Sequence, residues 1–245
     1  VEILPVDSEH SAIFQAIHGE ENKEIHKLLI TASGGPFRGR TTEELRRVTV
    51  ADTLKHPNWV MGRKITVDSA TLVNKGLEVM EAKWLFDMDL DHIQVVVQPQ
   101  SIIHSMVEFA DGAVIAQLGN PDMREPIQFA LSFPERLTLN NKKLDFASLQ
   151  GLTFEEPDME KFPCLPLAFE AIRKGGNVPC AMNAANEAAV AAFLKDSIRF
   201  YDIPEIISAC MAGVNFVEKP TVEDLLATNA EVYRAAAEMC AKLAR

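Results

Sequence analysis

The 245-residue chain lacks a long hydrophobic segment and lacks an excess of basic residues. No run of about 18 apolar residues is present, which argues against a transmembrane helix, and the N-terminus does not show the basic-then-apolar layout of a secretory signal. The 35 acidic and 24 basic residues give a formal charge of -11, which argues against general attraction to phosphate backbones or anionic membranes. We therefore expect a cytoplasmic protein without a nucleic-acid or membrane partner, in which any binding of phosphate is local.

Cysteine is scarce, with four residues that show neither metal-ligand spacing nor a dense disulfide pattern. Such usage is typical of a protein in a reducing compartment. The chain also lacks an internal repeat, a low-complexity tract and an initiating methionine. It opens on VEILPV, which resembles the middle of a buried strand, so we expect that sequence is missing upstream.

Apolar residues make up 47% of the chain, which is enough for a core in one large domain or two smaller ones. Strand-like segments occupy the first half, and Ala-rich helical segments follow residue 164. We expect an α/β (α+β) domain with a mixed sheet and a mobile loop, followed by a small C-terminal α-helical bundle. The expected boundaries are 1–133 for the first domain, 134–163 for a linker and 164–245 for the bundle.

Turn and capping signals locate the expected elements more closely. Asp111-Gly112 is a tight-turn signal, so the strands on either side should be antiparallel. Thr221 and Asp224 resemble a capping box, and Gly175 suits the C-terminus of a helix. The expected strands are 1–6, 24–31, 92–98, 103–109 and 113–118. The expected helices follow Asp7 and Ser8, occupy 69–86 and 124–132, and continue at 165–174, 183–195, 203–213 and 222–243.

Asp7 and Glu9 lie at the expected turn from the first strand into the first helix. Two carboxylates at such a turn can converge on a hard divalent cation, which prefers oxygen ligands. The alternative is that Asp7 caps the helix and Glu9 interacts with its positive N-terminal end. For an isolated Asp-x-Glu pattern, capping is the commoner role.

The segment Ser33-Gly34-Gly35-Pro36-Phe37 follows the second expected strand. A glycine pair lets backbone N–H groups approach an anion closely, and Ser33 adds a hydroxyl donor. The segment matches neither a Walker nor a dinucleotide fingerprint, and such a segment taken alone is most often a turn.

The stretch from His56 to Glu78 packs a histidine, a tryptophan, a serine, an amide, an ammonium group and a carboxylate into one short span. A helix beginning near Ser69 would place Asn74 and Glu78 on one face, beside an apolar stripe of Val73, Leu77, Met80 and Trp84. Alternatively, this helix is solvated and carries a Lys75–Glu78 ion pair. Before it, Trp59 and Met61 lie in an expected loop that either closes over a ligand or inserts Trp59 into the core.

Five segments, taken in order, closely resemble 1-deoxy-D-xylulose 5-phosphate reductoisomerases: LPVDSEHSAIF, TASGGPFR, HPNWVMGRKITVDSATLVNKGLE, PQSIIHSMV and LGNPDMR. The resemblance covers the whole chain and is densest in the first 125 residues. It implies metal-dependent isomerisation of a linear ketose phosphate, followed by NADPH-dependent reduction to 2-C-methyl-D-erythritol 4-phosphate in isoprenoid synthesis. Family members have an NADPH-binding domain, a catalytic domain and a helical bundle, and the chain is similar to the last two.

The resemblance also implies roles for individual residues. The implied metal ligands, for Mg²⁺ or Mn²⁺ with Co²⁺ also admitted by oxygen ligands, are Asp7, Glu9 and Glu78. The implied phosphate ligands are Ser33, Ser69, Asn74 and Lys75. Ser8 and Glu78 are implied contacts of the sugar, and His56 is both a contact and part of a covering loop with Trp59 and Met61. The implied catalytic residues are Glu9, His56 and Trp59, and the implied cofactor contacts are Met61 and Gly62.

The chain departs from the family pattern because no Gly-rich nucleotide-binding turn precedes Asp7. We therefore expect that this chain alone does not turn over substrate. Asn120 also stands where relatives commonly have glutamate.

The resemblance implies a homodimer that pairs through the sheet of residues 92–118. Two other functions are weighed: a non-catalytic dimerising or ligand-binding module, and a metal-dependent sugar-phosphate isomerase or aldolase that needs no nicotinamide.

Overall fold

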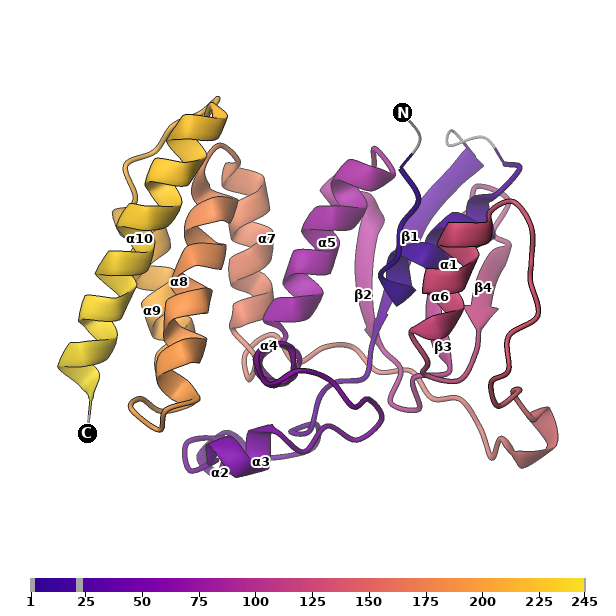
Figure 1. The fold of residues 1–245 in the computed structure, drawn as a ribbon, viewed down its shortest axis with the longest axis horizontal. Helices are drawn as coiled ribbons and strands as arrows, with labels where there is room; N and C mark the ends of the chain where they lie inside the picture. Colours follow the sequence, from indigo (N-terminus) through magenta and orange to yellow (C-terminus); the bar gives the residue numbers. More distant parts are fainter. Residues whose placement is uncertain (1–2, 21–23, 245) are drawn as a thin grey trace. The chain divides into compact units, whose positions relative to one another are not determined.

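The computed structural model describes residues 3–20 and 24–244. The chain divides into two compact units (Figure 1). Unit 1 consists of Val1–Gly34 and Glu78–Pro157, and unit 2 of Gly35–Leu77 and Asp158–Arg245. Among the described residues, no helix combines the length and the apolar character needed to cross a membrane. The three-part domain division given above stays a prediction.

Unit 1 is built on a mixed sheet with the strand order β2-β1-β3-β4 among its described residues. The strands are β1 (Ile25–Ala32), β2 (Ile93–Val97), β3 (Ile103–Phe109) and β4 (Val114–Leu118). The β1–β2 pair is parallel, whereas β1–β3 and β3–β4 are antiparallel. Asp111 accepts a hydrogen bond from the Ala113 N–H at 2.9 Å, and Gly112 adopts a φ of 87°. The predicted mixed sheet and the antiparallel pair around Asp111-Gly112 are both confirmed.

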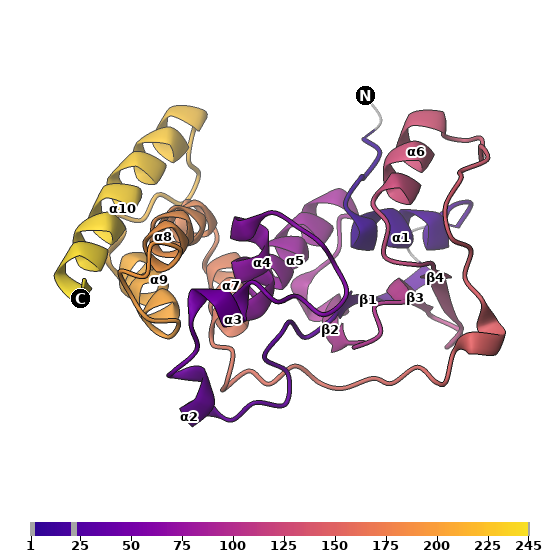
Figure 2. The same ribbon diagram turned by 60° about the horizontal axis from the view of Figure 1, so that its bottom comes forward.

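Two helices of unit 1 lie in layers over this sheet. Helix α1 (Ser8–Ile17) packs on β3 and β4, and α6 (Arg124–Ser132) packs on α1, as Figure 2 shows. Phe14 of α1 meets Phe129 of α6 edge to face, with ring centroids 6.3 Å apart. Burial of its apolar face fixes α1 on the sheet and therefore fixes the position of its first turn.

The predicted strand at residues 1–6 is wrong for its described part, residues 3–6, which have no regular structure. Residues 1 and 2 lie outside the described residues. Pro5 has no N–H to donate to a neighbouring strand, and both Ile3 and Val6 are exposed. The prediction was wrong because apolar composition alone does not show whether a segment can pair with a neighbouring strand.

The single helix predicted from Ser69 is two helices in the structure, α4 (Arg63–Thr71) and α5 (Val73–Leu85). Leu72 separates them with a left-handed backbone, φ 63° and ψ 13°. A left-handed conformation is unfavourable for a residue with a Cβ, so a leucine is not a residue that signals the end of a helix. The sequence periodicity therefore did not predict the break.

The predicted apolar stripe on this helix is correct at Val73, which is fully buried, and wrong at Trp84. Trp84 is 79% exposed, and Leu77 and Met80 are only partly buried. The apolar residues that α5 buries are Val73, Val79 and Ala82. The Lys83 ammonium group lies 4.9 Å from the centroid of the Trp84 ring, an attraction that suits an aromatic side chain at the surface.

Unit 2 contains the C-terminal bundle, in which α8 packs against the other three helices. The bundle helices are α7 (Cys164–Lys174), α8 (Val178–Phe193), α9 (Asp202–Gly213) and α10 (Val222–Leu243). Thr221 and Asp224 form the predicted capping box, and Gly175 caps α7. Helix α8 begins at Val178 rather than at the predicted residue 183, because Pro179 suits the first turn of a helix rather than stopping it.

Shorter elements complete the described structure. In unit 2 these are α2 (Thr42–Leu45) and α3 (Val50–Thr53), each begun by a capping box. In unit 1 they are the 3₁₀ turns η2 (Leu90–His92) and η3 (Phe146–Ser148).

A buried polar group joins α4 to α8 within unit 2. The Asp68 carboxylate accepts a hydrogen bond from the Asn186 amide at 2.9 Å and pairs with the Lys64 ammonium group at 2.8 Å. Burial raises the pKa of Asp68, against the opposing effects of Lys64 and Asn186. Removal of this carboxylate would leave the buried Asn186 amide without its acceptor, whereas Lys64 would keep its ion pair with Glu187 at 2.8 Å.

We predict that Asp68→Ala lowers the free energy of unfolding by about 2 kcal/mol, because it leaves the buried Asn186 amide without its acceptor. Urea denaturation measures the change. The control is Glu43→Ala, which removes an exposed ion pair with Arg47 and should change stability by less than about 0.5 kcal/mol. Equal effects of the two substitutions would contradict the prediction.

Candidate metal and substrate site

The structure brings together the three carboxylates that the family resemblance implies as metal ligands. One oxygen from each of Asp7, Glu9 and Glu78 lies within 4.8 Å of the others. Asp7 and Glu9 come from the start of α1, and Glu78, which is 3% exposed, comes from α5. Ionised carboxylates at such separations repel one another, and a divalent cation relieves that repulsion. The all-oxygen donor set fits a hard cation such as Mg²⁺ or Mn²⁺.

Local hydrogen bonds hold the two carboxylates of α1 in place. Asp7 Oδ1 accepts from the Ser8 N–H at 2.8 Å, so Asp7 does cap the helix. The Ser8 hydroxyl donates to Glu9 Oε2 at 2.5 Å. A carboxylate has two oxygens, so the capping role of Asp7 and its place in the carboxylate group are compatible. The two alternatives drawn from the sequence are therefore not exclusive.

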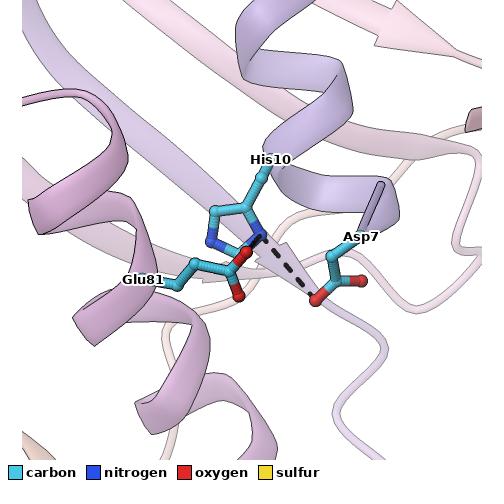
Figure 3. Close-up of side chains that lie close together, drawn as sticks. All are labelled: Asp7, His10 and Glu81. Atoms are coloured by element: carbon cyan, nitrogen blue, oxygen red, sulfur yellow. Dashed lines mark ion pairs between the residues drawn. The ribbon is translucent and has the colours of Figure 1, made fainter. Parts of the chain in front are cut away.

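His10 and Glu81 adjoin this group, and sequence reasoning missed both. The imidazole Nδ1 of His10 lies 3.7 Å from Asp7 Oδ2 and 3.8 Å from Glu81 Oε1 (Figure 3). His10 lies three residues after Asp7, and Glu81 lies three residues after Glu78. Residues three apart on a helix are neighbours, so this spacing was the available signal.

His104 of β3 is a third neighbour that sequence reasoning did not assign to the site. Burial lowers the pKa of His104, whereas the negative charges of Glu9 and Glu125 and hydrogen bonds with backbone at Asn120 and Gly119 act to raise it. A Cβ added to Gly119 would lie 2.8 Å from a Glu125 oxygen and 3.5 Å from His104 Nε2. Gly119 thus leaves room for these two side chains beside each other.

The break at Leu72 affects the residues that the resemblance assigns to phosphate. Because α5 begins anew at Val73, Asn74 and Lys75 lie in its first turn, while Ser69 lies in the last turn of α4. The N-terminus of a helix carries partial positive charge and unpaired backbone N–H groups, which favour an anion. Lys75 is nevertheless buried, so its charge acts locally.

Ser33 and Gly35 belong to the glycine-containing segment after β1. Ser33 lies in unit 1, directly after Ala32. Gly35, in unit 2, has a φ of 67°, and a Cβ there would come within 2.9 Å of the Ser69 carbonyl oxygen. Only glycine fits this approach without displacing backbone. The segment is therefore more than a turn, because it brings backbone against the last turn of α4.

The segment 56–62 is ordered around the His56 ring. Nδ1 accepts hydrogen bonds from the backbone N–H groups of Asn58, at 3.2 Å, and Trp59, at 2.9 Å. Two donors at Nδ1 require that the ring proton be on Nε2. Burial lowers the pKa of His56, which also favours the neutral ring.

The other loop residues named above lie close by in the sequence but differ in exposure. Trp59 and Met61 are partly buried, and Gly62 is exposed. Gly62 precedes α4, and its carbonyl accepts from the Thr66 N–H and hydroxyl. The mobility of this loop and the cofactor roles of Met61 and Gly62 stay predictions.

Comparisons with known proteins point to one family. A family model for the 1-deoxy-D-xylulose 5-phosphate reductoisomerase C-terminal domain matches residues 3–86, and a model for the DXP reductoisomerase C-terminal domain matches residues 118–235. The 1-deoxy-D-xylulose 5-phosphate reductoisomerase of Lachnospira eligens is 62% identical over 228 residues, which cover 93% of this chain and 60% of the relative. That of Bacteroides fragilis is 55% identical over 240 residues, covering 98% and 62%. The chain thus spans about three fifths of the length of these relatives.

Solved structures are similar too. The Zymomonas mobilis reductoisomerase in complex with NADPH matches with a TM-score of 0.90 and 45% identity, over 97% of this chain and 61% of that one. A DOX-P reductoisomerase in complex with NADPH, fosmidomycin and magnesium matches with a TM-score of 0.91 and 42% identity, over 98% and 64%. Both the sequence and the fold of the chain therefore match one part of these enzymes.

The His56 geometry predicts a dependence on pH. Because the fold holds the ring neutral, its stabilising hydrogen bonds are present above the ordinary histidine pKa of 6.5 and are lost as the pH falls through the lowered value. We expect Trp59 fluorescence in a Trp84→Phe background to change with a midpoint below 6.5. The control is Trp59→Phe, whose remaining Trp84 should not report this transition. A Trp59 midpoint at or above 6.5 would contradict the assignment.

Proposed function

The chain belongs to the 1-deoxy-D-xylulose 5-phosphate reductoisomerase family, and from this premise we propose that it supplies the metal-binding and sugar-phosphate-binding part of that reaction. The reaction isomerises 1-deoxy-D-xylulose 5-phosphate and reduces the product with NADPH to 2-C-methyl-D-erythritol 4-phosphate. The convergence of Asp7, Glu9 and Glu78 is the observation that carries the proposal. NADPH is proposed as the hydride donor of the complete enzyme.

We assign the divalent cation, Mg²⁺ or Mn²⁺, to these three carboxylates. A bound cation of this kind polarises a carbonyl group and stabilises negative charge on the oxygens of the sugar. Glu9 is held for this role by the Ser8 hydroxyl, which donates to it. Ser8 is a proposed contact of the sugar, and Glu9 is proposed to act in catalysis as well as in binding.

The phosphate is assigned to Ser69, Asn74 and Lys75, with Ser33 as a further hydroxyl donor. The support is the position of Asn74 and Lys75 in the first turn of α5 and of Ser69 at the end of α4. A hydroxyl, an amide and an ammonium group bind a dianion by charge-assisted hydrogen bonds without needing a basic surface. This local set is compatible with the formal net charge of -11.

We propose that the segment 56–62 covers the bound sugar. With Nδ1 of His56 accepting from two backbone N–H groups, the Nε2–H is the group that can donate to a substrate oxygen. Trp59 is proposed to exclude water from the reacting carbons, and Met61 and Gly62 to approach the cofactor. The cytoplasm is the proposed compartment, consistent with four free cysteines.

Binding of fosmidomycin tests the proposal, because a similar reductoisomerase is solved in complex with it and magnesium. We expect calorimetry to detect binding to this chain only when Mg²⁺ is present, since the metal carboxylates organise the site. Glu78→Gln should weaken the Mg²⁺-dependent binding by at least about tenfold, through loss of a charged ligand. The matched control is Glu20→Gln, an exposed carboxylate outside the site, which should bind as the wild type does.

Binding that is equal with and without Mg²⁺, or that Glu78→Gln leaves unchanged, would refute the metal assignment. The same preparation mixed with substrate, Mg²⁺ and NADPH should show no oxidation of NADPH, because its 245 residues contain no Gly-rich nucleotide fingerprint. Turnover of the substrate without nicotinamide would instead favour a metal-dependent isomerase or aldolase.

We also propose that two chains pair through the sheet of residues 92–118. Strand β4 lies at the edge of the sheet, and its Val114 and Ile115 are 51% and 43% exposed. An exposed apolar edge strand is a template for pairing with another chain. Among the described residues, the opposite edge strand β2 bridges Glu155 through Val97.

Sedimentation at micromolar concentration should therefore give a dimer for the wild type. Ile115→Lys should shift the equilibrium toward monomer, because it brings like charges together at the interface. Leu226→Lys changes an exposed leucine of α10 in unit 2 and serves as the control, with no expected effect. A monomeric wild type would disprove the proposed interface.

A further inference from the structure

Asp7, His10 and Glu81 lie close together (Figure 3), and this group shares only Asp7 with the three-carboxylate group. One ligand atom from each of the three side chains lies within 4.8 Å of the others. His10 is 0% exposed, whereas the Glu81 side chain is 45% exposed, so the group reaches from the interior of unit 1 to solvent. Neither His10 nor Glu81 has a role in the function proposed above.

The hydrogen bonding of His10 places a proton on one of its ring nitrogens. Nε2 lies 2.9 Å from the backbone carbonyl oxygen of Glu78, which can only accept, so Nε2 must donate. Nδ1 has no hydrogen-bond partner among the described residues and is directed at two carboxylates. The Phe86 ring stacks on the imidazole at 6.4 Å with an interplanar angle of 10°, which helps to hold this orientation.

With Nε2 donating, the neutral form of the ring would present its Nδ1 lone pair to two negatively charged groups. A buried nitrogen without a partner is costly, and its lone pair gains nothing from carboxylate oxygens, which are also acceptors. A cation among the three atoms would satisfy all of them together. Metal-bound histidines commonly donate their second ring N–H to a backbone carbonyl, which is the arrangement that His10 has with Glu78.

We propose that Asp7, His10 and Glu81 form a second divalent-cation site. Its mixed nitrogen and oxygen ligands suit Mn²⁺, Co²⁺ or Zn²⁺ better than Mg²⁺, which prefers oxygen. Three protein ligands leave at least one position for water or another small ligand. The proposal depends on the geometry of His10 and stands independently of the reaction proposed above.

Asp7 belongs to both groups, so the two sites are coupled. Its carboxylate would lie between two cations, as carboxylates do in two-metal sites. A cation at the second site would neutralise part of the negative charge of the Asp7 carboxylate, and it would repel a cation at the first site. Occupancy by a transition metal at the second site therefore weakens binding of Mg²⁺ at the first site.

Metal titration of the chelator-treated chain tests the proposal. We expect Zn²⁺ or Co²⁺ to bind with one equivalent more than Mg²⁺, as counted by calorimetry and by metal analysis after gel filtration. Glu81→Gln should remove the additional equivalent, or weaken it by at least about tenfold, while leaving Mg²⁺ binding in place. Glu20→Gln, which changes an exposed carboxylate outside both groups, should retain it.

A spectroscopic measurement identifies the nitrogen ligand. Bound Mn²⁺ should show ¹⁴N coupling in pulsed electron paramagnetic resonance, and His10→Gln should abolish that coupling. If His10→Gln does not fold, Glu81→Gln decides, because Glu81 is half exposed and its change should preserve the fold.

The same stoichiometry for Zn²⁺, Co²⁺ and Mg²⁺, an unchanged additional equivalent in Glu81→Gln, or Mn²⁺ without ¹⁴N coupling would each overturn the second site. Each of these three results is expected if His10 is protonated and paired with the two carboxylates, because its Nδ1 then has no lone pair for a metal ion. Failure of the proposed function is distinct from it, because that failure appears as loss of Mg²⁺-dependent binding of fosmidomycin.

Discussion

The accumulation of negative charge around the start of α1 is the constraint on which unit 1 depends. Asp7, Glu9 and Glu78 converge within 4.8 Å, and Glu78 is almost fully buried. Bringing ionised carboxylates together out of water costs free energy, which the positive N-terminal end of α1 offsets only in part. The fold maintains this arrangement because α1 is fixed between the sheet and α6 (Figure 2). A divalent cation is the partner that such a rigid, anionic group can bind without rearrangement.

In the proposed function, helix α5 carries two residues assigned to the phosphate and one assigned to the metal. Its first turn carries Asn74 and Lys75, and Glu78 follows about one turn, or roughly 5.4 Å, further along. The left-handed Leu72 makes this possible, because it ends α4 and creates a new helix N-terminus before Asn74.

Local signals in the sequence predicted local structure well. The Asp111-Gly112 turn and the capping box of Thr221 and Asp224 are determined by residues within four positions of each other, and both are confirmed. The left-handed backbone at Leu72 and the exposure of Trp84 have no local signal in the sequence, so periodicity did not predict them. The three carboxylates came from family resemblance. His10 and Glu81 were missed because their helical spacing is informative only once α1 and α5 are known to be adjacent.

The two oxygens of Asp7 explain how one residue can support both the fold and the chemistry of the site. Oδ1 accepts from the Ser8 N–H and caps α1, while Oδ2 faces His10. Alanine at this position would remove the cap and the charge together, so a loss of metal binding could reflect fraying of α1. Asparagine is as good a cap as aspartate but carries no negative charge. Asp7→Asn therefore separates the two roles: the helix should remain, and any loss of cation affinity should then come from the ligand itself.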